Sequence, residues 1–596
     1  MSNPQEGRAI GAVTAAQSRR VAEQGIFRSA SAVDPAAVGV AEALVATLNG
    51  MASQPLLTPE LQQLTDQVRQ RATVGFPRIC AHDGVRLSAH TIKLKGDEPR
   101  PVVIVPSGWT PFGWVLFEYA YLRLALRGCH VLAYTPRGIG YTMAVADGRY
   151  VDAPFTSGGT VDVAGPLDRY DGSTVIDYAC EYFAPSRIAF LGESYGSGIG
   201  QLVAAHDPEA RVDAVVALST WADLADSLAA YDTRRRELVR ALVGFTGGPA
   251  ERKFDPATRQ LLEDFEDGRN LDEVVAWAKE RSPSSYADLT NARGVPTFFS
   301  HTWHETLFPA RQIVEHVDRL TVPKRLNLWI GDHAAPEGPG LTVPSGGTDT
   351  PVEEAFAWLD HHLLGADNGV SAWAPVSSQI MFTHTGGASG VREEAASWAE
   401  VTRRTERWYL TSGAEDRRDG GLATTVPDTG WKREFTAGEL TDASAVDDIL
   451  VTGQAEWRGE PKSYPTDKFD RSHLAVWTSG PLPEPRRIRG VPELSLTVRS
   501  SAAATTLVAY VFDVAADRTA RIVTHEPLTL PELTPGQDRA VTWRLQAAGY
   551  DLAADHRLML VVTSRDKLYS TASVAGSTTT ITSPDSGPAH LDLPLG

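Results

Sequence analysis

Short apolar runs recur between about residues 76 and 370, and helical stretches separate several of them. The runs lie at 102–105, 130–134, 188–191, 212–218, 296–299 and 326–330. Most are continuously apolar, which is typical of parallel strands buried on both faces of a sheet. Two of the intervening helical stretches are 117–126 and 173–182. This alternation predicts a doubly wound α/β sheet.

The N-terminal residues have a different, helical pattern. Thr58 and Pro59 are a typical helix start, with threonine as N-cap and proline at the first helical position. Leu61, Leu64 and Val68 then recur at helical spacing, so we expect this helix to pack on the body of the protein. Residues 1–30 are polar, and we predict that they are partly disordered.

A turn and one irregular interval interrupt the α/β pattern. Residues 82–85 read His-Asp-Gly-Val and place a hairpin turn between two strand-like runs. Between 220 and 294 the pattern is helical and rich in charge, without a strand. An insertion there, after a central strand, predicts a helical cap over the carboxyl ends of the strands. The next helix starts with a capping box from Thr350 to Glu353 and stops at Gly365.

Beyond residue 370 the helical pattern ends. Leu494, Leu496 and Val498 alternate with polar residues, as in a half-buried strand. Residues 507–514 and 558–562 form fuller apolar runs, and clusters of proline, glycine and aspartate separate such runs. We therefore predict a C-terminal all-β domain, a sandwich of the jelly-roll type.

These patterns divide the chain of 596 residues into five parts. The predicted parts are an N-terminal helical extension (1–75), the first half of the α/β core (76–220), the cap (221–292), the second half of the core (293–370) and the β domain (371–596).

Charge and composition argue against several classes of partner. Acidic side chains number 74 against 56 basic ones, a formal net charge of −18, and such a surface repels nucleic acid. No run has the 18 or more apolar residues of a membrane span, and the first 20 residues do not resemble a secretory signal. The three cysteines form no CxxC pair, which argues against a disulfide framework or a structural zinc site. We expect a cytoplasmic protein with neither nucleic acid nor membrane as a partner.

One motif points to nucleophilic catalysis. Residues 192–196 read Gly-Glu-Ser-Tyr-Gly, which matches the nucleophile elbow G-x-S-x-G. The glycines are needed because a strand turns at once into a helix and leaves no room for flanking side chains. The apolar run 188–191 precedes the motif, and a helix of small residues follows it. This context predicts that Ser194 is the nucleophile of a serine hydrolase with the α/β-hydrolase fold.

A serine nucleophile needs a histidine base, and in this fold the chain order is serine, acid, histidine. His333 directly follows the predicted strand 326–330, where the last catalytic loop is expected. His301 and His304 follow the preceding strand, where the acid belongs, and His361 and His362 lie on the terminal helix. We therefore predict that His333 is the base.

The acid and the oxyanion hole complete the predicted site. Glu305 lies in the loop after the strand at 296–300 and is our predicted acid, with Asp332 and Asp223 as rivals. The oxyanion needs two donors, for which we predict the backbone N–H groups of Tyr195 and Trp109. Trp109 could equally form a wall of the pocket.

Several stretches resemble the CocE/NonD hydrolases, which are related to the X-prolyl dipeptidyl-peptidases of peptidase family S15. The likeness covers about residues 78–580. The matching stretches are DGVRL from Asp83, PRG at 136–138, GESYG, Leu-Phe-Pro at 307–309, GDH at 331–333, WLDHHLLG from Trp358 and SHLAVWTSGPL from Ser472. The last looks like the opening of the family's jelly roll.

The resemblance implies that Ser194, Glu305 and His333 are the nucleophile, the acid and the base. Two positions depart from the family. The family usually has aspartate where this chain has Glu305. Cocaine-esterase-like members use a tyrosine hydroxyl in the oxyanion hole, near the position of Trp109, so the backbone or the indole N–H must serve here.

The function we predict is cleavage of an ester or amide, including aminoacyl or X-Pro types, through an acyl-serine intermediate. It requires no metal or organic cofactor, and the substrate is a small molecule or short peptide. Cap residues Trp221, Tyr231, Phe245, Trp277 and Tyr286 could form an aromatic pocket. Pairing of exposed β domains would give a homodimer. The alternatives are a biosynthetic acyltransferase that uses the same acyl-enzyme and a non-catalytic binding protein on a hydrolase scaffold.

Overall fold

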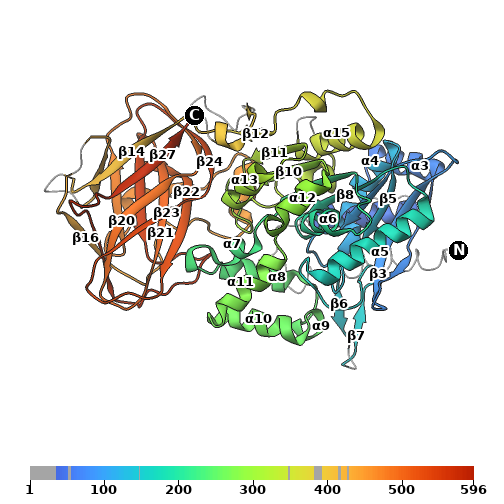
Figure 1. The fold of residues 1–596 in the computed structure, drawn as a ribbon, viewed down its shortest axis with the longest axis horizontal. Helices are drawn as coiled ribbons and strands as arrows, with labels where there is room; N and C mark the ends of the chain where they lie inside the picture. Colours follow the sequence, from blue (N-terminus) through green and yellow to red (C-terminus); the bar gives the residue numbers. More distant parts are fainter. Residues whose placement is uncertain are drawn as a thin grey trace.

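The computed structural model describes residues 35–50, 56–145, 148–345, 350–381, 392–413, 418–425 and 428–596. Figure 1 shows an α/β domain on the right, in blue to yellow, and an all-β domain on the left, in orange to red. This arrangement confirms the predicted fold class. The segment 1–30, which we predicted to be partly disordered, lies outside the described residues. Within the described ranges, no helix is long and apolar enough to cross a membrane.

The first sheet is mostly parallel. Its order among the described residues is β1-β3-β5-β4-β8-β9-β10-β11-β12-β13, with β2 paired to β3. Neighbours from β5 to β12 in this order are parallel, whereas β1, β2, β3 and β13 pair antiparallel. The bounds are β1 (Ala72–Gly75), β2 (Arg78–Cys80), β3 (Arg86–Leu94), β4 (Val102–Pro106), β5 (His130–Tyr134), β8 (Ile188–Glu193), β9 (Ala214–Leu218), β10 (Thr297–Thr302), β11 (Lys324–Trp329), β12 (Val376–Gln379) and β13 (Arg392–Ala395).

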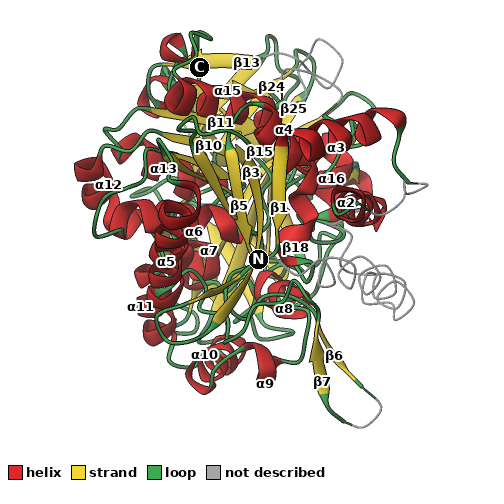
Figure 2. Ribbon diagram, turned by 90° about the vertical axis from the view of Figure 1, so that its right-hand side faces the viewer, coloured by secondary structure: helices red, strands yellow, loops and turns green. Residues whose placement is uncertain are grey.

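The central strands confirm the strand predictions from the apolar runs. Every residue of β4, β5, β8 and β9 is buried, as expected when helices cover both faces of a parallel sheet. The predicted hairpin joins β2 and β3, and Gly84 takes the positive φ of +84° that this turn requires. A separate hairpin of β6 (Thr142–Ala144) and β7 (Tyr150–Asp152) projects from the body (Figure 2).

Helices cover the two faces of this sheet in two groups, each with its own apolar core (Figure 2). One face carries α2 (Pro35–Leu48), α3 (Pro59–Arg71), α4 (Glu118–Leu126) and α15 (Pro351–Leu364). The other carries α5 (Pro166–Phe183), α6 (Tyr195–His206) and α13 (Ala310–Arg319). A short helix, α14 (Gly338–Leu341), follows the loop after β11.

The predicted helix ends are confirmed, with one difference. Thr58 Oγ1 accepts from the Leu61 N–H at 3.3 Å, and Gly365 ends α15 with a left-handed φ of +69°. Thr350 Oγ1 accepts from the Glu353 N–H at 3.5 Å. The Glu353 carboxylate binds Arg123 on α4 instead of returning to the backbone, so half of the predicted capping box forms.

The segment between β9 and β10 is helical, as predicted for the cap. Its helices are α7 (Leu224–Ala229), α8 (Arg236–Phe245), α9 (Ala250–Lys253), α10 (Pro256–Asp267), α11 (Leu271–Glu280) and α12 (Ala287–Arg293). The buried Lys253 attaches this segment to the core, because its Nζ donates to the carbonyls of Gly138 (3.0 Å) and Gly140.

The first sheet continues beyond residue 370, where the sequence suggested that the β domain begins. Strand β12 is parallel to β11, and β13 pairs antiparallel with β12. The first strand of the second sheet is β14 (Arg404–Thr411). The expectation that helices end at 370 is also wrong, since α16 (Val451–Trp457) lies within the β domain. A helix of seven residues that includes Gly453 has too little periodicity to be recognised in the sequence.

The second sheet is almost wholly antiparallel, with β15 and β18 as a parallel pair. After β14 its strands are β15 (Gly420–Ala423), β16 (Lys432–Thr436), β17 (Tyr464–Pro465), β18 (Leu474–Ser479), β19 (Arg486–Gly490), β20 (Glu493–Ser500), β21 (Thr505–Val514), β22 (Thr519–Leu530), β23 (Arg539–Arg544), β24 (Ala548–Leu552), β25 (Arg557–Thr563), β26 (Thr578–Thr582) and β27 (His590–Leu595). The predicted strands at 494–498, 507–514 and 558–562 are confirmed as parts of β20, β21 and β25.

Candidate active site

Ser194 lies at the sharp turn between β8 and α6. Its φ of 53° and ψ of −120° are strained for a residue with a side chain. A Cβ on Gly192 would lie 2.2 Å from the Gly196 carbonyl carbon, and a Cβ on Gly196 would lie 2.1 Å from the Pro106 oxygen. Both glycines of the motif are therefore required by close backbone approach, which confirms the predicted elbow geometry.

The structure brings together the three residues that the sequence predicted as nucleophile, acid and base. His333 Nε2 lies 2.8 Å from Ser194 Oγ. On the other side of the ring, His333 Nδ1 lies 3.0 Å from Glu305 Oε1 and 3.2 Å from Oε2. The three come from the loops after β8, β10 and β11, at the carboxyl edge of the parallel sheet, where α/β proteins place their sites. This geometry suits transfer of the serine proton to the histidine.

The rival residues have other partners. Asp332 Oδ1 accepts from the Thr306 N–H at 2.7 Å, and Asp223 caps α7 by accepting from the Asp226 N–H at 3.0 Å. The other candidate histidines contact the Phe308 carbonyl (His301), Glu456 (His304), the Ala366 carbonyl (His361) and the Trp358 ring (His362).

The longer side chain of Glu305 folds back onto its own loop. Its Oε1 accepts from the backbone N–H groups of Leu307 (3.1 Å) and Phe308 (3.4 Å) while it contacts His333. Burial raises the pKa of Glu305, but His333 and these hydrogen bonds outweigh it and hold the pKa below its ordinary value. The extra methylene relative to aspartate is therefore accommodated within the loop.

His333 is surrounded by carboxyl groups. Burial lowers its pKa, but Glu305, Glu193 and Asp332 together outweigh burial and raise it to about 9. Burial raises the pKa of Asp332 and of Glu337 to about 7 each. Glu337 accepts hydrogen bonds from Ser219 Oγ (3.0 Å) and Ser300 Oγ (2.5 Å), beneath the catalytic loops. The His333 imidazole therefore binds a second proton readily in this setting.

The two residues predicted for the oxyanion hole pack against each other. The rings of Trp109 and Tyr195 meet edge to face, with centroids 5.1 Å apart. The Tyr195 hydroxyl donates to Asp168, and the Trp109 indole N–H donates to the Leu242 carbonyl on α8 at 2.8 Å. The indole N–H is thus engaged by the cap, and the backbone N–H of Trp109 is the group left to serve as a donor.

A cavity of about 630 Å³ lies in front of Ser194. Its lining is mainly apolar and comes from several parts of the chain, among them Ser194, Leu307 and a series of residues between 333 and 343. The loop after β4 contributes Trp109, the cap contributes Leu242 and Phe245, α16 of the β domain contributes Trp457, and α2 contributes Ala37. Glu193 and Arg458 add charged groups to this lining.

Of the five cap aromatics that we considered for the pocket, Phe245 is the one that lines this cavity. The others have contacts elsewhere: Trp221 Nε1 donates to the Arg281 carbonyl, the Tyr231 hydroxyl accepts from the Arg544 N–H, Trp277 packs under the Arg281 guanidinium, and the Tyr286 hydroxyl donates to the Glu280 carbonyl.

The β-domain wall of the cavity was not predicted from the sequence. Helix α16 packs directly on the loop that carries His333, because a Cβ on Gly453 would lie 2.2 Å from Asp332 Cβ. A Cβ on Gly331 of the same loop would likewise lie 3.1 Å from the Cβ of Trp457. No local signal indicates this contact, since it depends on how the two domains dock. Glu193, by contrast, lies inside the G-x-S-x-G motif, so the sequence could have identified it as a residue of the cavity lining.

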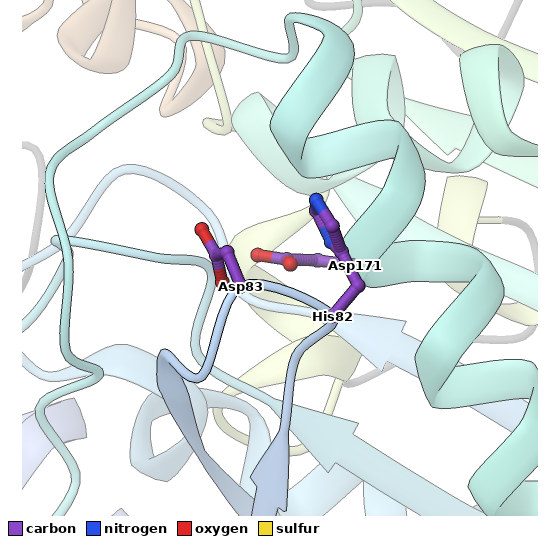
Figure 3. A group of neighbouring side chains, drawn as sticks. All are labelled: His82, Asp83 and Asp171. Carbon is purple, nitrogen blue, oxygen red and sulfur yellow. The ribbon is translucent and has the colours of Figure 1, made fainter.

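Among the residues that the structure describes, one group has a geometry that could hold a metal ion: His82, Asp83 and Asp171 (Figure 3). The guanidinium of Arg137 already pairs with both carboxylates, at 2.9 Å from Asp83 Oδ2 and at 2.6 Å from Asp171 Oδ1. We therefore interpret this group as an ion-pair network that ties the β2–β3 hairpin to α5. It gives Arg137, the central residue of the PRG turn at 136–138, a structural role.

Two family models match consecutive parts of the chain. The X-Pro dipeptidyl-peptidase (S15 family) model matches residues 83–335, and the X-Pro dipeptidyl-peptidase C-terminal non-catalytic domain model matches residues 368–593. A predicted serine esterase of Mycobacterium bovis is 27% identical over 198 residues, which are 32% of this chain and 27% of that relative. The match thus spans about a quarter of the relative's length.

Solved structures with the same fold cover most of the chain. An aminopeptidase from a marine sediment Thaumarchaeota archaeon has a TM-score of 0.66 at 15% identity, over 88% of this chain and 96% of that one. An alpha-amino acid ester hydrolase has a TM-score of 0.64 at 17% identity, over 88% and 97%. A CocE/NonD family hydrolase from Staphylococcus aureus has a TM-score of 0.65 at 12% identity, over 88% and 94%. At these identities the likeness shows the fold.

Proposed function

Since the chain belongs to the S15 family of serine hydrolases and carries both of its domains, we propose that it cleaves an ester or amide bond through an acyl intermediate on Ser194. The main support for this proposal is the pair of hydrogen bonds that connects Ser194 Oγ to His333 and His333 to Glu305. A neutral serine is a weak nucleophile, and these two contacts supply a base for the serine and a carboxylate that orients the base.

In the first half of the reaction, Ser194 Oγ attacks the substrate carbonyl while His333 Nε2 takes the serine proton. His333 then gives that proton to the leaving alcohol or amine. In the second half, His333 removes a proton from water, which attacks the acyl carbon. The bond between that carbon and Ser194 Oγ then breaks, the acid is released, and His333 returns the proton to Ser194 Oγ. Glu305 keeps the imidazole in the tautomer with Nδ1–H and stabilises its charged form.

The oxyanion of each tetrahedral intermediate is stabilised by the backbone N–H groups of Tyr195 and Trp109. The Tyr195 N–H lies in the first turn of α6, where amides lack an intrahelical acceptor. Asp168 holds the Tyr195 ring and α8 holds the Trp109 indole, which supports a preorganised pair of donors. In this role, backbone donation takes the place of a tyrosine hydroxyl.

The substrate we propose is a small molecule or short peptide with a bulky apolar acyl or leaving group. The apolar lining of the cavity supports this class, because burying such a group stabilises the complex by about 25 cal/mol per Å². An aminoacyl or X-Pro substrate would place its ammonium group where the lining offers one carboxylate, Glu193. Apolar esters therefore fit the lining better.

No feature of the site favours an acyltransferase or a non-catalytic binding protein. We also propose a cytoplasmic location without a nucleic acid or membrane partner, and the three unpaired cysteines and the acidic charge support this. The exposed β domain is the surface on which we expect two copies to pair.

Labelling with a fluorophosphonate probe, located by peptide mass mapping, tests the proposed function. We expect labelling at Ser194 that Ser194→Ala and His333→Ala both abolish. Ester and amide substrates with acyl groups of increasing length would then define the class. Absence of labelling in folded protein would contradict the proposal.

A further inference from the structure

The residue before the nucleophile places a second carboxyl at the catalytic histidine. Glu193 ends β8, and its carboxyl lines the cavity in front of Ser194. Its Oε1 lies 3.5 Å from His333 Nε2, the same nitrogen that contacts Ser194 Oγ. His333 therefore has a carboxyl at each ring nitrogen, with Glu305 at Nδ1 and Glu193 at Nε2.

The loop after β4 leaves room for this carboxyl. A Cβ on Gly108 would lie 2.5 Å from Glu193 Oε2, so any side chain at position 108 would displace it. The Glu193 side chain is 9% exposed. Within the described part of the chain, His333 is the ionisable side chain that forms an ion-pair contact with the Glu193 carboxyl. A buried carboxylate with so little compensation is costly unless it binds a proton or faces a cation.

On the basis of the proposed function, we propose that Glu193 is a positioning residue that shares one proton with His333 and thereby sets the fraction of His333 able to act as base. The pair with one proton has two forms. In one, Glu193 is a carboxylate and His333 is an imidazolium. In the other, Glu193 is a neutral acid and His333 is neutral. The two forms contain the same atoms and differ in the position of that proton.

The second form is the one that can begin catalysis. Neutral His333 donates from Nδ1 to Glu305, so Nε2 presents a lone pair to the Ser194 hydroxyl. A charged Glu193 beside that lone pair disfavours the neutral histidine and favours the imidazolium. A protonated Glu193 removes this effect and also keeps negative charge away from the site where the oxyanion forms. Ionisation of Glu193 thus delays full activity to more alkaline pH.

The surrounding charges support this assignment. Burial raises the pKa of Glu193 to about 7, although His333 lowers it. Glu305 and Glu337 also face Glu193 and raise its pKa, while Asp332 faces His333. His301 faces Glu305 from β10, and Arg458 is among the residues that line the same cavity. Because the two groups interact closely, their ionisations belong to the pair rather than to either residue.

The pH dependence of Ser194 labelling by an uncharged fluorophosphonate tests this role without a known substrate. In the wild type, we expect the second-order rate constant to rise in two steps between pH 5 and pH 10. In Glu193→Gln, we expect one step whose midpoint lies about 1 to 3 pH units lower than the upper wild-type step, because the charge that favours the imidazolium is gone. Glu193→Asp keeps an ionisable group and should retain two steps.

Glu337→Gln is the matched control. It removes another buried carboxyl near the site, but one that binds Ser219 and Ser300, and two steps should remain. A single-step rise in the wild type, or a Glu193→Gln profile that coincides with the wild-type profile, would overturn the role of Glu193 while leaving the hydrolase proposal intact. Absence of labelling at every pH would overturn the proposed function itself, and this role with it.

Discussion

At the scale of single residues, Glu305 stands where the family usually has aspartate. Its contacts with His333 and with its own loop argue that glutamate can serve as the acid here. Replacing Glu305 with glutamine keeps the shape but removes the charge that stabilises the imidazolium. We expect the rate of Ser194 labelling and of ester hydrolysis to fall by about 10³-fold or more. Stopped-flow or steady-state assays with a p-nitrophenyl ester would measure this loss.

Asp332 provides the matched control for that experiment. Its carboxyl binds Thr306 rather than the imidazole nitrogens of His333, so Asp332→Asn should retain activity within about tenfold. If Asp332→Asn lost more activity than Glu305→Gln, the assignment of the acid would be reversed.

The buried carboxyl of Glu337 leads us to predict that the stability of the folded protein depends on pH. Burial raises its pKa from 4.5 to about 7, so the folded protein binds the proton more tightly than the unfolded chain does. Stability from this group is therefore full below pH 4.5 and is lost as pH rises through 7, by about 3 kcal/mol at most. Glu337→Gln should flatten this fall, seen as a smaller difference between the thermal midpoints at pH 5 and pH 8. An unchanged difference would show that Glu337 ionises freely.

At the scale of elements, α16 brings the β domain to the wall of the cavity in front of Ser194. Trp457 on this helix lines the cavity, and we expect Trp457→Ala to lower kcat/KM for esters of bulky apolar acids by about tenfold, through lost apolar contact. An acetate ester, whose acyl group is much smaller, is the internal control, and we expect it to be cleaved at nearly the wild-type rate. Equal losses for both esters would mean that α16 supports the catalytic loop rather than the substrate.

The same helix illustrates what the sequence could and could not predict. The elbow, the strand before His333 and the loop of Glu305 are local patterns, because hydrophobic runs and glycines at fixed spacing determine them. The approach of Gly453 to Asp332 depends on docking between segments more than 100 residues apart, and nothing near Gly453 indicates it. The pairing of β12 with β11 also joins segments that are distant in the sequence, since Leu326 pairs with Val376. Sequence therefore predicts which residues meet at Ser194 and leaves the β-domain wall of the cavity unpredicted.

At the scale of the whole molecule, the cap and the β domain meet through buried charge. Arg235, just before α8, donates to both oxygens of Glu526 on β22 at 3.1 Å and to the Tyr569 hydroxyl at 2.9 Å. Arg235 and Glu526 are almost fully buried. His304, which precedes Glu305 in the chain, similarly pairs with Glu456 on α16 at 2.8 Å. Contacts of this kind couple the folding of the two domains to the integrity of the site.

We therefore expect the described domains to unfold together, and Glu526→Gln to shift that single transition. The substitution leaves the Arg235 guanidinium buried opposite a neutral amide, which costs about 3 kcal/mol or more. Asp538→Asn is the matched control, since its partner Arg499 is 43% exposed and surface pairs contribute about 0 to 1 kcal/mol. Scanning calorimetry would measure both variants. Two separate transitions, of which Glu526→Gln moved only one, would show that the β domain folds independently and that its wall of the active site can detach without unfolding the core.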